Sequence, residues 1–194
     1  ETPSEIVDNP FLRFFVCHGY QIVYHKKATD SGGWVLDGRF EARKAVENLG
    51  DVSERPIPGA WHRWEGVFEN GYQHGKWLSF FEDGTLASRT FYKDGKLEGT
   101  RTYWYNDGGK MNEVGFADGK KHGKEITWSP DGKLWGIAKW DRGDLMRLEI
   151  YEDGEMARVL EGAEAREYYV KSIQERIARD SDSLNSDEWR SYAE

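Results

Sequence analysis

Few residues in this sequence are of types that do chemistry, and the histidines are the first to consider. His74 and His122 occupy equivalent positions in a sequence repeat that is described below. The copy of the repeat between them has Glu98 at this position. A metal site would require side chains from separate repeats to converge on one ion. We therefore interpret both histidines as exposed residues beside turns, and we predict no bound metal and no cofactor.

Nucleophiles and phosphate-binding loops are the next possibility. Cys17 and His18 are adjacent, but neighbouring residues of a strand point to opposite faces, whereas a thiolate nucleophile needs a positioned base. The aspartates of the many Asp-Gly pairs lack the Asp-x-Asp-x-Asp-Gly spacing of a calcium loop. No Walker, Gly-x-Ser-x-Gly or His-Glu-x-x-His motif occurs. We predict no catalytic residues and a protein that is not an enzyme.

A short basic cluster raises the question of nucleic acid. Lys120, Lys121, His122 and Lys124 lie beside aromatic residues, an arrangement that is able to stack single strands. The chain as a whole has a net charge of −8, and acidic residues mark most of its turns. We therefore interpret the cluster as a solvated rim and predict no nucleic-acid partner.

Composition limits what holds these residues in place. The chain of 194 residues is long enough for one domain. Hydrophobic residues make up only 38%, but aromatic residues reach 14%, and disordered chains are poor in them. Cys17 is the only cysteine, so no internal disulfide forms, and no apolar run is long enough for a membrane-spanning helix. Acidity gathers in residues 149–194, which hold 13 of the 35 acidic but only 6 of the 27 basic residues.

A repeat of 24 residues organises the chain. Two interleaved series of glycines, most of them preceded by asparagine or aspartate, recur with this spacing: Gly71, Gly95, Gly119 and Gly143, and Gly84, Gly108 and Gly132. Asn-Gly and Asp-Gly between short aromatic runs are a strong hairpin signal, because both central residues of a type I′ turn have φ > 0. Each repeat is therefore predicted to be two strands, and successive repeats to form an antiparallel meander.

Side chains follow the same period. The recurring columns are Phe80, Trp104 and Trp128; Leu78, Thr102, Ile126 and Ile150; and Phe68, Tyr92, Phe116 and Trp140. Cross-strand aromatic pairs contribute roughly 0.2–1 kcal/mol each, so such columns are able to hold a single-layer sheet together. We expect the Phe80 column to pack against neighbouring rungs of the sheet and against the flanking elements. The alternate residues of the same strands form a mixed aromatic and hydroxyl surface, from which we predict these partner-binding residues: Phe81, Tyr103, Tyr105 and Thr127.

The segment GYQHGKWLSFFEDGTLASRTFYKDGKLEGTRTYWYNDGGK resembles the MORN repeat in its bacterial variant form. The shared pattern is a pair of glycines, an aromatic strand, an Asp-Gly turn, and a second strand that ends at a tyrosine before the next turn. The resemblance covers about residues 61–160. It implies an extended sheet of β-hairpins, without catalysis, that serves as a scaffold or protein-binding surface. Many bacterial members are labelled antitoxins from their genomic context.

The predicted fold class is mainly β: one extended, twisted, antiparallel sheet of hairpin repeats with short flanking helices. We expect residues 1–60 to be an N-terminal capping segment, residues 61–160 the repeats, and residues 161–194 a C-terminal helix and an acidic tail.

The two flanks carry more detailed expectations. In the N-terminal segment, we expect two strands within residues 11–27, a further strand opened by Gly32-Gly33, and a short helix over 38–49. In the C-terminal segment, the spacing of apolar residues predicts a helix over 163–179. We expect it to dock near Ile150 and Val159 through one face: Tyr169, Val170, Ile173 and Ile177.

The predicted function is a non-catalytic scaffold or adaptor that binds protein partners through an exposed sheet face, as an accessory subunit of a larger assembly. The alternative is an antitoxin or immunity-type protein that neutralises a toxin. A net charge of −8 is repelled by anionic lipid, so contact with a membrane surface is expected only through a partner. The opening Glu1-Thr2-Pro3 suits a chain cut by signal peptidase, which favours a periplasmic or other extracytoplasmic location over a cytoplasmic one.

Overall fold

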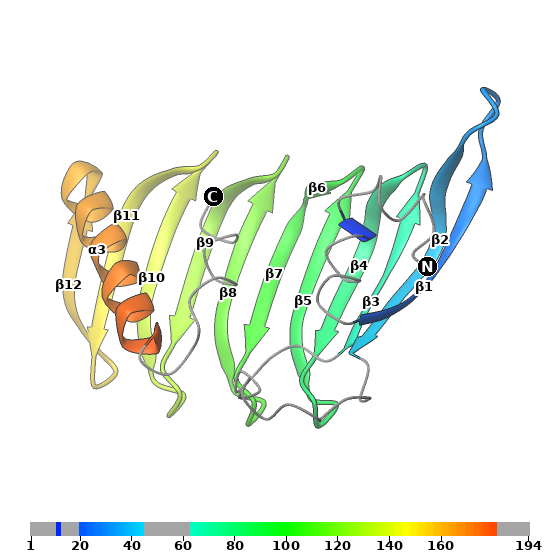
Figure 1. Cartoon of the computed structure of the whole chain (residues 1–194). Coiled ribbons are helices and arrows are strands. Elements are labelled where there is room, and N and C mark those ends of the chain that lie inside the picture. The colour runs from blue at the N-terminus through cyan, green and yellow to red at the C-terminus, as the bar shows by residue number, and fades with distance from the viewer. Residues whose placement is uncertain (1–10, 13–19, 45–62, 182–194) are drawn as a thin grey trace.

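A computed structural model of the chain describes residues 11–12, 20–44 and 63–181. These residues form one open antiparallel sheet of 12 strands, with the helix α3 (Gly162–Ser181) at its C-terminal end (Figure 1). The strands are β1 (Tyr20–Ala28), β2 (Trp34–Lys44), β3 (Arg63–Glu69), β4 (Tyr72–Phe80), β5 (Leu86–Lys93), β6 (Lys96–Leu97), β7 (Gly99–Trp104), β8 (Lys110–Ala117), β9 (Lys120–Trp128), β10 (Leu134–Asp141), β11 (Asp144–Glu152) and β12 (Glu155–Glu161). Apart from β6, which pairs with β5, the strands lie side by side in chain order. The predicted fold class is confirmed.

Two kinds of turn alternate along the sheet. In the first glycine series both turn residues have positive φ, as at Asp94 (51°) and Gly95 (78°), which is the type I′ pattern. In the second series the glycine alone has positive φ, and the N–H of Gly84 donates to the Phe81 carbonyl oxygen at 3.0 Å. This bond closes a type I turn that ends in a left-handed glycine. The type I′ prediction was therefore right for one series and wrong for the other.

The N-terminal segment differs from the prediction in two places. Residues 38–44 belong to β2, so the helix predicted over 38–49 is wrong there, and residues 45–49 lie outside those described. The alanine spacing that indicated a helix is overridden by pairing on both sides, since Phe40 lies opposite Tyr24 of β1 and Gly66 of β3.

The other flank predictions have mixed outcomes. Phe11 and Leu12 are helical rather than part of a strand, whereas β1 and the strand after Gly32-Gly33 are confirmed. The C-terminal helix is also confirmed, one residue longer at its start and two at its end than predicted. Cys17, His18 and the acidic tail after residue 181 lie outside the described residues.

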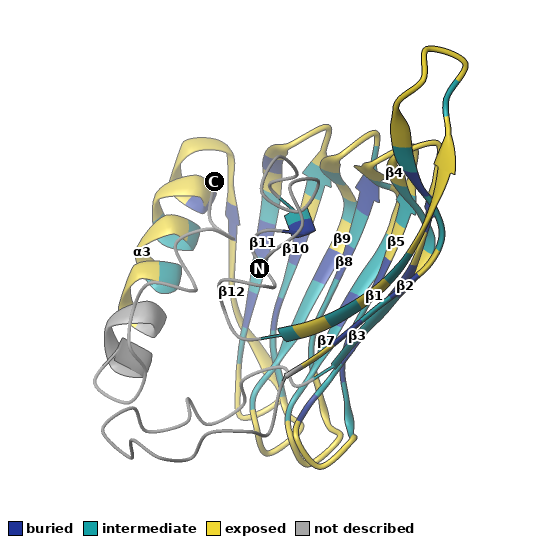
Figure 2. Ribbon diagram, turned by 45° about the vertical axis from the view of Figure 1, so that its right-hand side comes forward, coloured by how far each residue is buried: buried dark blue, intermediate teal, exposed yellow. Residues whose placement is uncertain are grey.

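The sheet has one face that carries both flanking elements, which we call the cap face. At one end Leu12 packs with Phe40, Phe68 and Trp77, and at the other Ala165 of α3 packs with Leu148. Figure 2 shows α3 lying against the sheet, with exposed residues gathered at the turns.

The Phe80 column lies on the opposite face. In the backbone pairing Phe80 lies opposite Arg63. The next residue, Trp64, packs with the cluster under Leu12 on the cap face, so Arg63 and Phe80 point to the other face. The expected packing of this column against flanking elements is therefore wrong for the flanking elements that are described, Leu12 and α3. The β-bulges and the first-series turns set which face of each strand meets the caps, and sequence columns alone do not fix that choice.

Candidate functional site

A single row of side chains crosses the cap face from β2 to β12. Followed through the backbone pairing, this central row consists of Phe40, Gly66, Trp77, Thr90, Arg101, Val114, Glu125, Ala138, Leu148 and Leu160. Its ends are apolar and lie under the two flanking elements. Its middle holds Arg101 and Glu125, which occupy in later repeats the position that Trp77 holds in the first.

The N-terminal end of the central row is an aromatic cluster. Trp77 is only 2% exposed, and its ring stacks on Phe40 with the centroids 5.4 Å apart. Phe68 meets the same indole edge-on at 5.2 Å. Residue 66 has to be glycine, because a Cβ there would lie 2.2 Å from the Trp77 ring. This end is filled by apolar contact and offers no polar chemistry.

At the C-terminal end, α3 docks as predicted but with a different face. Ala165 is fully buried against the row, while Tyr169 and Ile173 are half-buried. Val170 is 53% exposed, so its predicted burial is wrong. The helix starts at once after β12, and this short connection fixes its rotation so that Ala165 faces the sheet.

The strand contacts predicted for α3 are half correct. Ile150 belongs to the cluster beneath the helix and is 5% exposed, whereas Val159 is 38% exposed. Val159 alternates with Leu160, which belongs to the cluster, so it points to the other side of β12. The side chain of Ile177 lies outside the described part of the helix.

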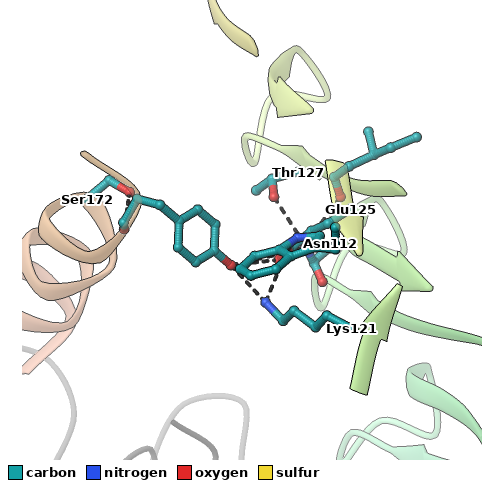
Figure 3. Close-up of polar contacts among 8 residues, drawn as sticks. Asn112, Lys121, Glu125, Thr127 and Ser172 are labelled. Atoms are coloured by element: carbon teal, nitrogen blue, oxygen red, sulfur yellow. Dashed lines mark hydrogen bonds and ion pairs between the residues drawn. The ribbon is translucent and has the colours of Figure 1, made fainter. Parts of the chain in front are cut away.

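Between the ends, Glu125 forms a buried polar network with α3 (Figure 3). Its carboxylate accepts hydrogen bonds from Lys121 Nζ at 2.9 Å, Trp140 Nε1 at 2.8 Å and the Tyr169 hydroxyl at 3.0 Å. Asn112 Nδ2 adds a fourth at 3.2 Å. Both oxygens are occupied, and Lys121 compensates the charge. We interpret this network as a clamp that holds the helix to β9, not as a general base.

Sequence reasoning missed this network. Lys121 was assigned to a solvated rim, but it lies over the Trp140 ring at 4.6 Å as well as beside Glu125. A usable signal existed in the repeat: Glu125 replaces Trp77 at an inward-facing position. A charge at such a position indicates a partner that neutralises it.

Arg101 is the other charged member of the central row, and its environment differs. Its guanidinium lies between two rings, 5.2 Å from the Tyr103 centroid and 4.9 Å from that of Phe116. Nε is buried, and it has no hydrogen-bond acceptor in the described part of the chain. Burial raises the pKa of the Tyr92 and Tyr103 hydroxyls, and the nearby positive charge of Arg101 acts in the opposite direction.

The opposite face pairs its own charges. Arg63 bonds Glu65 at 2.9 Å, and Lys110 bonds Glu113 at 2.7 Å. The Arg63 guanidinium also lies 3.9 Å from the Phe80 ring centroid. These two pairs neutralise their charges locally, and Arg63 covers the Phe80 ring, so this part of the surface is well suited to water.

The four predicted partner-binding residues lie in different environments. Phe81 is 8% exposed, which leaves little of it available. Tyr103 is half-buried on the cap face beside Arg101. The Tyr105 hydroxyl donates to the Trp128 carbonyl oxygen at 2.9 Å, and Thr127 Oγ1 accepts from Asn112 Nδ2 at 3.1 Å. Their role in partner binding stays a prediction.

The histidines lie beside carboxylates near turns. His74 Nδ1 is 3.4 Å from Glu69 Oε2, and His122 Nδ1 is 3.4 Å from Asp141 Oδ1. Within the described ranges, no three histidine, cysteine or acidic residues lie close enough together to hold a metal ion.

A shallow hollow beside β5 and β7 is the other place to look for chemistry. Its lining includes Arg89, Phe91 and two carboxylates, Glu98 and Glu113. Glu98 accepts from the backbone N–H of Asp118 at 2.9 Å, and Glu113 from Lys110. The two carboxylates are thus held by other groups. In the part of the chain that is described, no helix has the length and apolar character needed to cross a membrane.

Comparison with known proteins bears on the repeats. The sequence profile of the MORN repeat variant matches residues 73–94, 87–106 and 121–141. No curated protein matches the sequence.

Two solved structures are similar. One belongs to the "Glycosylation Associate Protein (Gap123) complex from Streptococcus agalactiae", with 15% identity and a TM-score of 0.34 over 67% of this chain. The other is "GtfA/B complex bound to UDP and GlcNAc", with 12% identity and a TM-score of 0.22 over 70% of this chain. The matches span 25% and 31% of those chains. Likeness at this level carries no argument about function.

The matched segments lie within the hairpins of the repeat: the first runs from β4 to the end of β5, the second from β5 through β7, and the third from β9 to β10. MORN repeats are commonly modules of protein–protein interaction or scaffolds. Within these segments, the chain contains variant repeats of the MORN family.

Proposed function

We propose that this protein is a non-catalytic scaffold or adaptor, and that it binds a partner protein over β5, β7 and β8 on the cap face. The observation that carries the proposal is the change of character along the central row. Leu12 and α3 pack on its apolar ends, while the stretch between them presents half-buried tyrosines and an arginine. Tyrosine and arginine are enriched where proteins bind one another, since each combines apolar contact area with a polar group.

The opposite face is a weaker candidate for the same role. It holds the ion pairs Arg63–Glu65 and Lys110–Glu113, and its Arg89 shares a hollow with the carboxylates of Glu98 and Glu113. A partner that covered it would have to desolvate these pairs without replacing their interactions. We therefore assign the partner to the cap face.

The proposal includes the absence of catalysis. A catalytic carboxylate has to reach a substrate, and it needs an oxygen that is not already held. Glu125 accepts bonds on both oxygens, and Glu98 and Glu113 each accept from a neighbouring group. These contacts support a structural role for the acidic residues that we considered.

Adjacent residues on the two faces provide the test. Tyr103 and Trp104 are neighbours, and each is half-buried, but they point to opposite sides of β7. A photo-crosslinking phenylalanine analogue would replace each in turn, in the full chain expressed in its native source. We expect the variant at Tyr103 to capture one defined protein and the variant at Trp104 to capture none.

The other outcomes decide against parts of the proposal. Capture from Trp104 alone would place the partner on the opposite face. If neither position captured a protein, the scaffold function itself would be rejected. A toxin captured at Tyr103 would favour the antitoxin alternative over the structural scaffold.

A further inference from the structure

Two arginines on neighbouring strands have nearly the same surroundings on opposite faces of the sheet. Arg89 lies 5.9 Å from the Phe91 ring centroid and 5.6 Å from that of Trp104. Arg101 lies between Tyr103 and Phe116 at similar distances. In both, Nε is buried without an acceptor in the described part of the chain. They differ in the face on which each lies and in the charges nearby, because the carboxylates of Glu98 and Glu113 line the same hollow as Arg89.

The guanidinium of Arg101 has unused hydrogen-bonding capacity. Rings on two sides hold its plane in place, and a guanidinium has five N–H donors. Within the described residues, no carboxylate oxygen lies within 4.0 Å of it, although many other arginines of the sheet have such a partner. Desolvating a charged group without a partner is unfavourable, so an occupant that supplies acceptors gains a charge-assisted hydrogen bond.

The charge around Arg101 determines what that occupant is. Glu125 lies two strands away in the central row, beyond Val114, and its carboxylate is taken by Lys121, Trp140 and Tyr169. Because Lys121 and Glu125 cancel, the middle of the central row is left with the single positive charge of Arg101. The flanking tyrosines have raised pKa values and are neutral at physiological pH.

We infer that Arg101 is the anchor of the docking surface and that it binds a carboxylate side chain in an acidic segment of the partner protein. This inference rests on the proposed function and adds the chemistry of the partner. The planar fork of a guanidinium binds a carboxylate through two parallel hydrogen bonds. The apolar walls of Tyr103 and Phe116 exclude water from that bond and strengthen it.

A short polyglutamate peptide carrying a fluorophore is the probe, with polylysine of equal length as the reversed-charge control. The full chain has a net charge of −8, so bulk electrostatics oppose binding of the acidic peptide, and any affinity reports a local site. We expect polyglutamate to show saturable binding in fluorescence anisotropy. Any binding of polylysine is expected to be unaffected by Arg101→Gln. Arg101→Gln is expected to weaken polyglutamate binding about tenfold or more.

Arg89→Gln is the matched control, because it removes the same charge from a similar ring environment on the opposite face. It is expected to change the affinity within about twofold. Arg101→Lys keeps the charge but loses the fork, so an intermediate loss is expected. Near-ultraviolet circular dichroism of each variant establishes that the fold is retained. Nitrogen-15 NMR of the full chain should show the Arg101 Nε–H signal moving as peptide is added.

Several results would overturn the inference. Equal weakening by Arg101→Gln and Arg89→Gln would mean that only net charge matters. An unchanged affinity in Arg101→Gln would place the acidic peptide elsewhere. The Arg101 Nε–H signal could also move when salt is added to the chain without peptide, and then stay unchanged when peptide is added. That result would identify the chain's own acidic residues after 181 as the occupant. Each of these leaves the scaffold function standing if Tyr103 still captures a protein, whereas failure of that capture rejects both.

Discussion

The two ends of the cap face are closed by different chemistry, although one repeat builds both. At the N-terminal end Trp77 fills its position with an indole ring that touches Phe40 and Phe68. At the C-terminal end, two repeats later, Glu125 stands in the corresponding place and is neutralised by Lys121 and by donors that include Tyr169 of α3. The first contact is apolar and tolerates no water, while the second is polar and depends on complete satisfaction of one carboxylate.

This difference indicates that the residue at a given position of the central row depends more on the element that packs over it than on the repeat itself. The repeat fixes the strands, the turns and the inward direction of residues 77, 101 and 125. The side chain at each position then depends on what lies above it. Aromatic rings lie over Trp77 and the margin of a helix over Glu125, whereas the buried Arg101 Nε has no acceptor among the described residues.

Removing the indole at the N-terminal end is the change with the largest expected effect. Trp77→Ala should lower the free energy of unfolding by about 3–5 kcal/mol, because it leaves a cavity among packed rings. Trp104→Ala is the matched variant on the opposite face, where the indole is half-buried, and about 1–2 kcal/mol is expected. Urea denaturation of both variants measures the difference. Equal losses would contradict the assignment of the core to the cap face.

The rotation of α3 comes next. Ala165 is 0% exposed and Val170 is 53% exposed, so a charge placed at each should have very different consequences. Ala165→Asp is expected to lower the free energy of unfolding by about 3 kcal/mol, through burial of an unpaired carboxylate. Val170→Asp should stay within about 0.5 kcal/mol. If Val170→Asp proved the more harmful in thermal unfolding, the helix would present the face that the sequence pattern alone predicted.

The polar clamp is expected to contribute somewhat less than these apolar contacts. Glu125→Ala should lower the free energy of unfolding by about 2–3 kcal/mol, since it leaves Lys121 and the Trp140 N–H without their acceptor. Glu113→Ala on the opposite face removes a more exposed pair and should cost about 0.5 kcal/mol. A double-mutant cycle of Glu125→Ala with Tyr169→Phe measures the coupling to α3. Strict additivity would show that the helix is held without this contact.

Much of the fold was predictable because backbone chemistry fixes it locally. Asn-Gly and Asp-Gly pairs at fixed spacing specify hairpins, and hairpins in sequence specify a meander. The same local logic failed in residues 38–44, where alanines suggested a helix and pairing with two neighbouring strands made them part of β2. Only the distant segment β3 could have revealed this, and a local pattern carries no information about it.

The candidate site was less predictable for a similar reason. Tyr103 was identified from the alternation of residues along its strand and from its side-chain type. Arg101 and Glu125 were not identified, because their roles depend on which face is capped. Bulges that shift register between paired strands, as between Val114 and Phe116 of β8, change how columns map onto faces. A column of residues spaced by 24 therefore shows which side chains are equivalent without showing which side they share with α3.

The smallest expected effect concerns pH and sharpens the contrast between Arg101 and its capped neighbours. Burial raises the pKa of the Tyr103 hydroxyl above its ordinary value of about 10. A group whose folded pKa is raised contributes stability that is fully present below the unfolded pKa, and this stability is lost as the pH rises through the folded pKa. Wild-type stability should therefore fall as the pH climbs above about 10, and Tyr103→Phe should make that fall shallower. Tyr92→Phe should act in the same direction, since the Tyr92 pKa is also raised by burial.

The positive charge of Arg101 lowers the Tyr103 pKa, so Arg101→Gln is expected to raise this pKa further in a titration of tyrosinate absorbance. A carboxylate peptide that docks on Arg101 would offset that charge and move the Tyr103 titration in the same direction in the wild-type chain. A peptide that binds without moving the titration would be located away from Arg101.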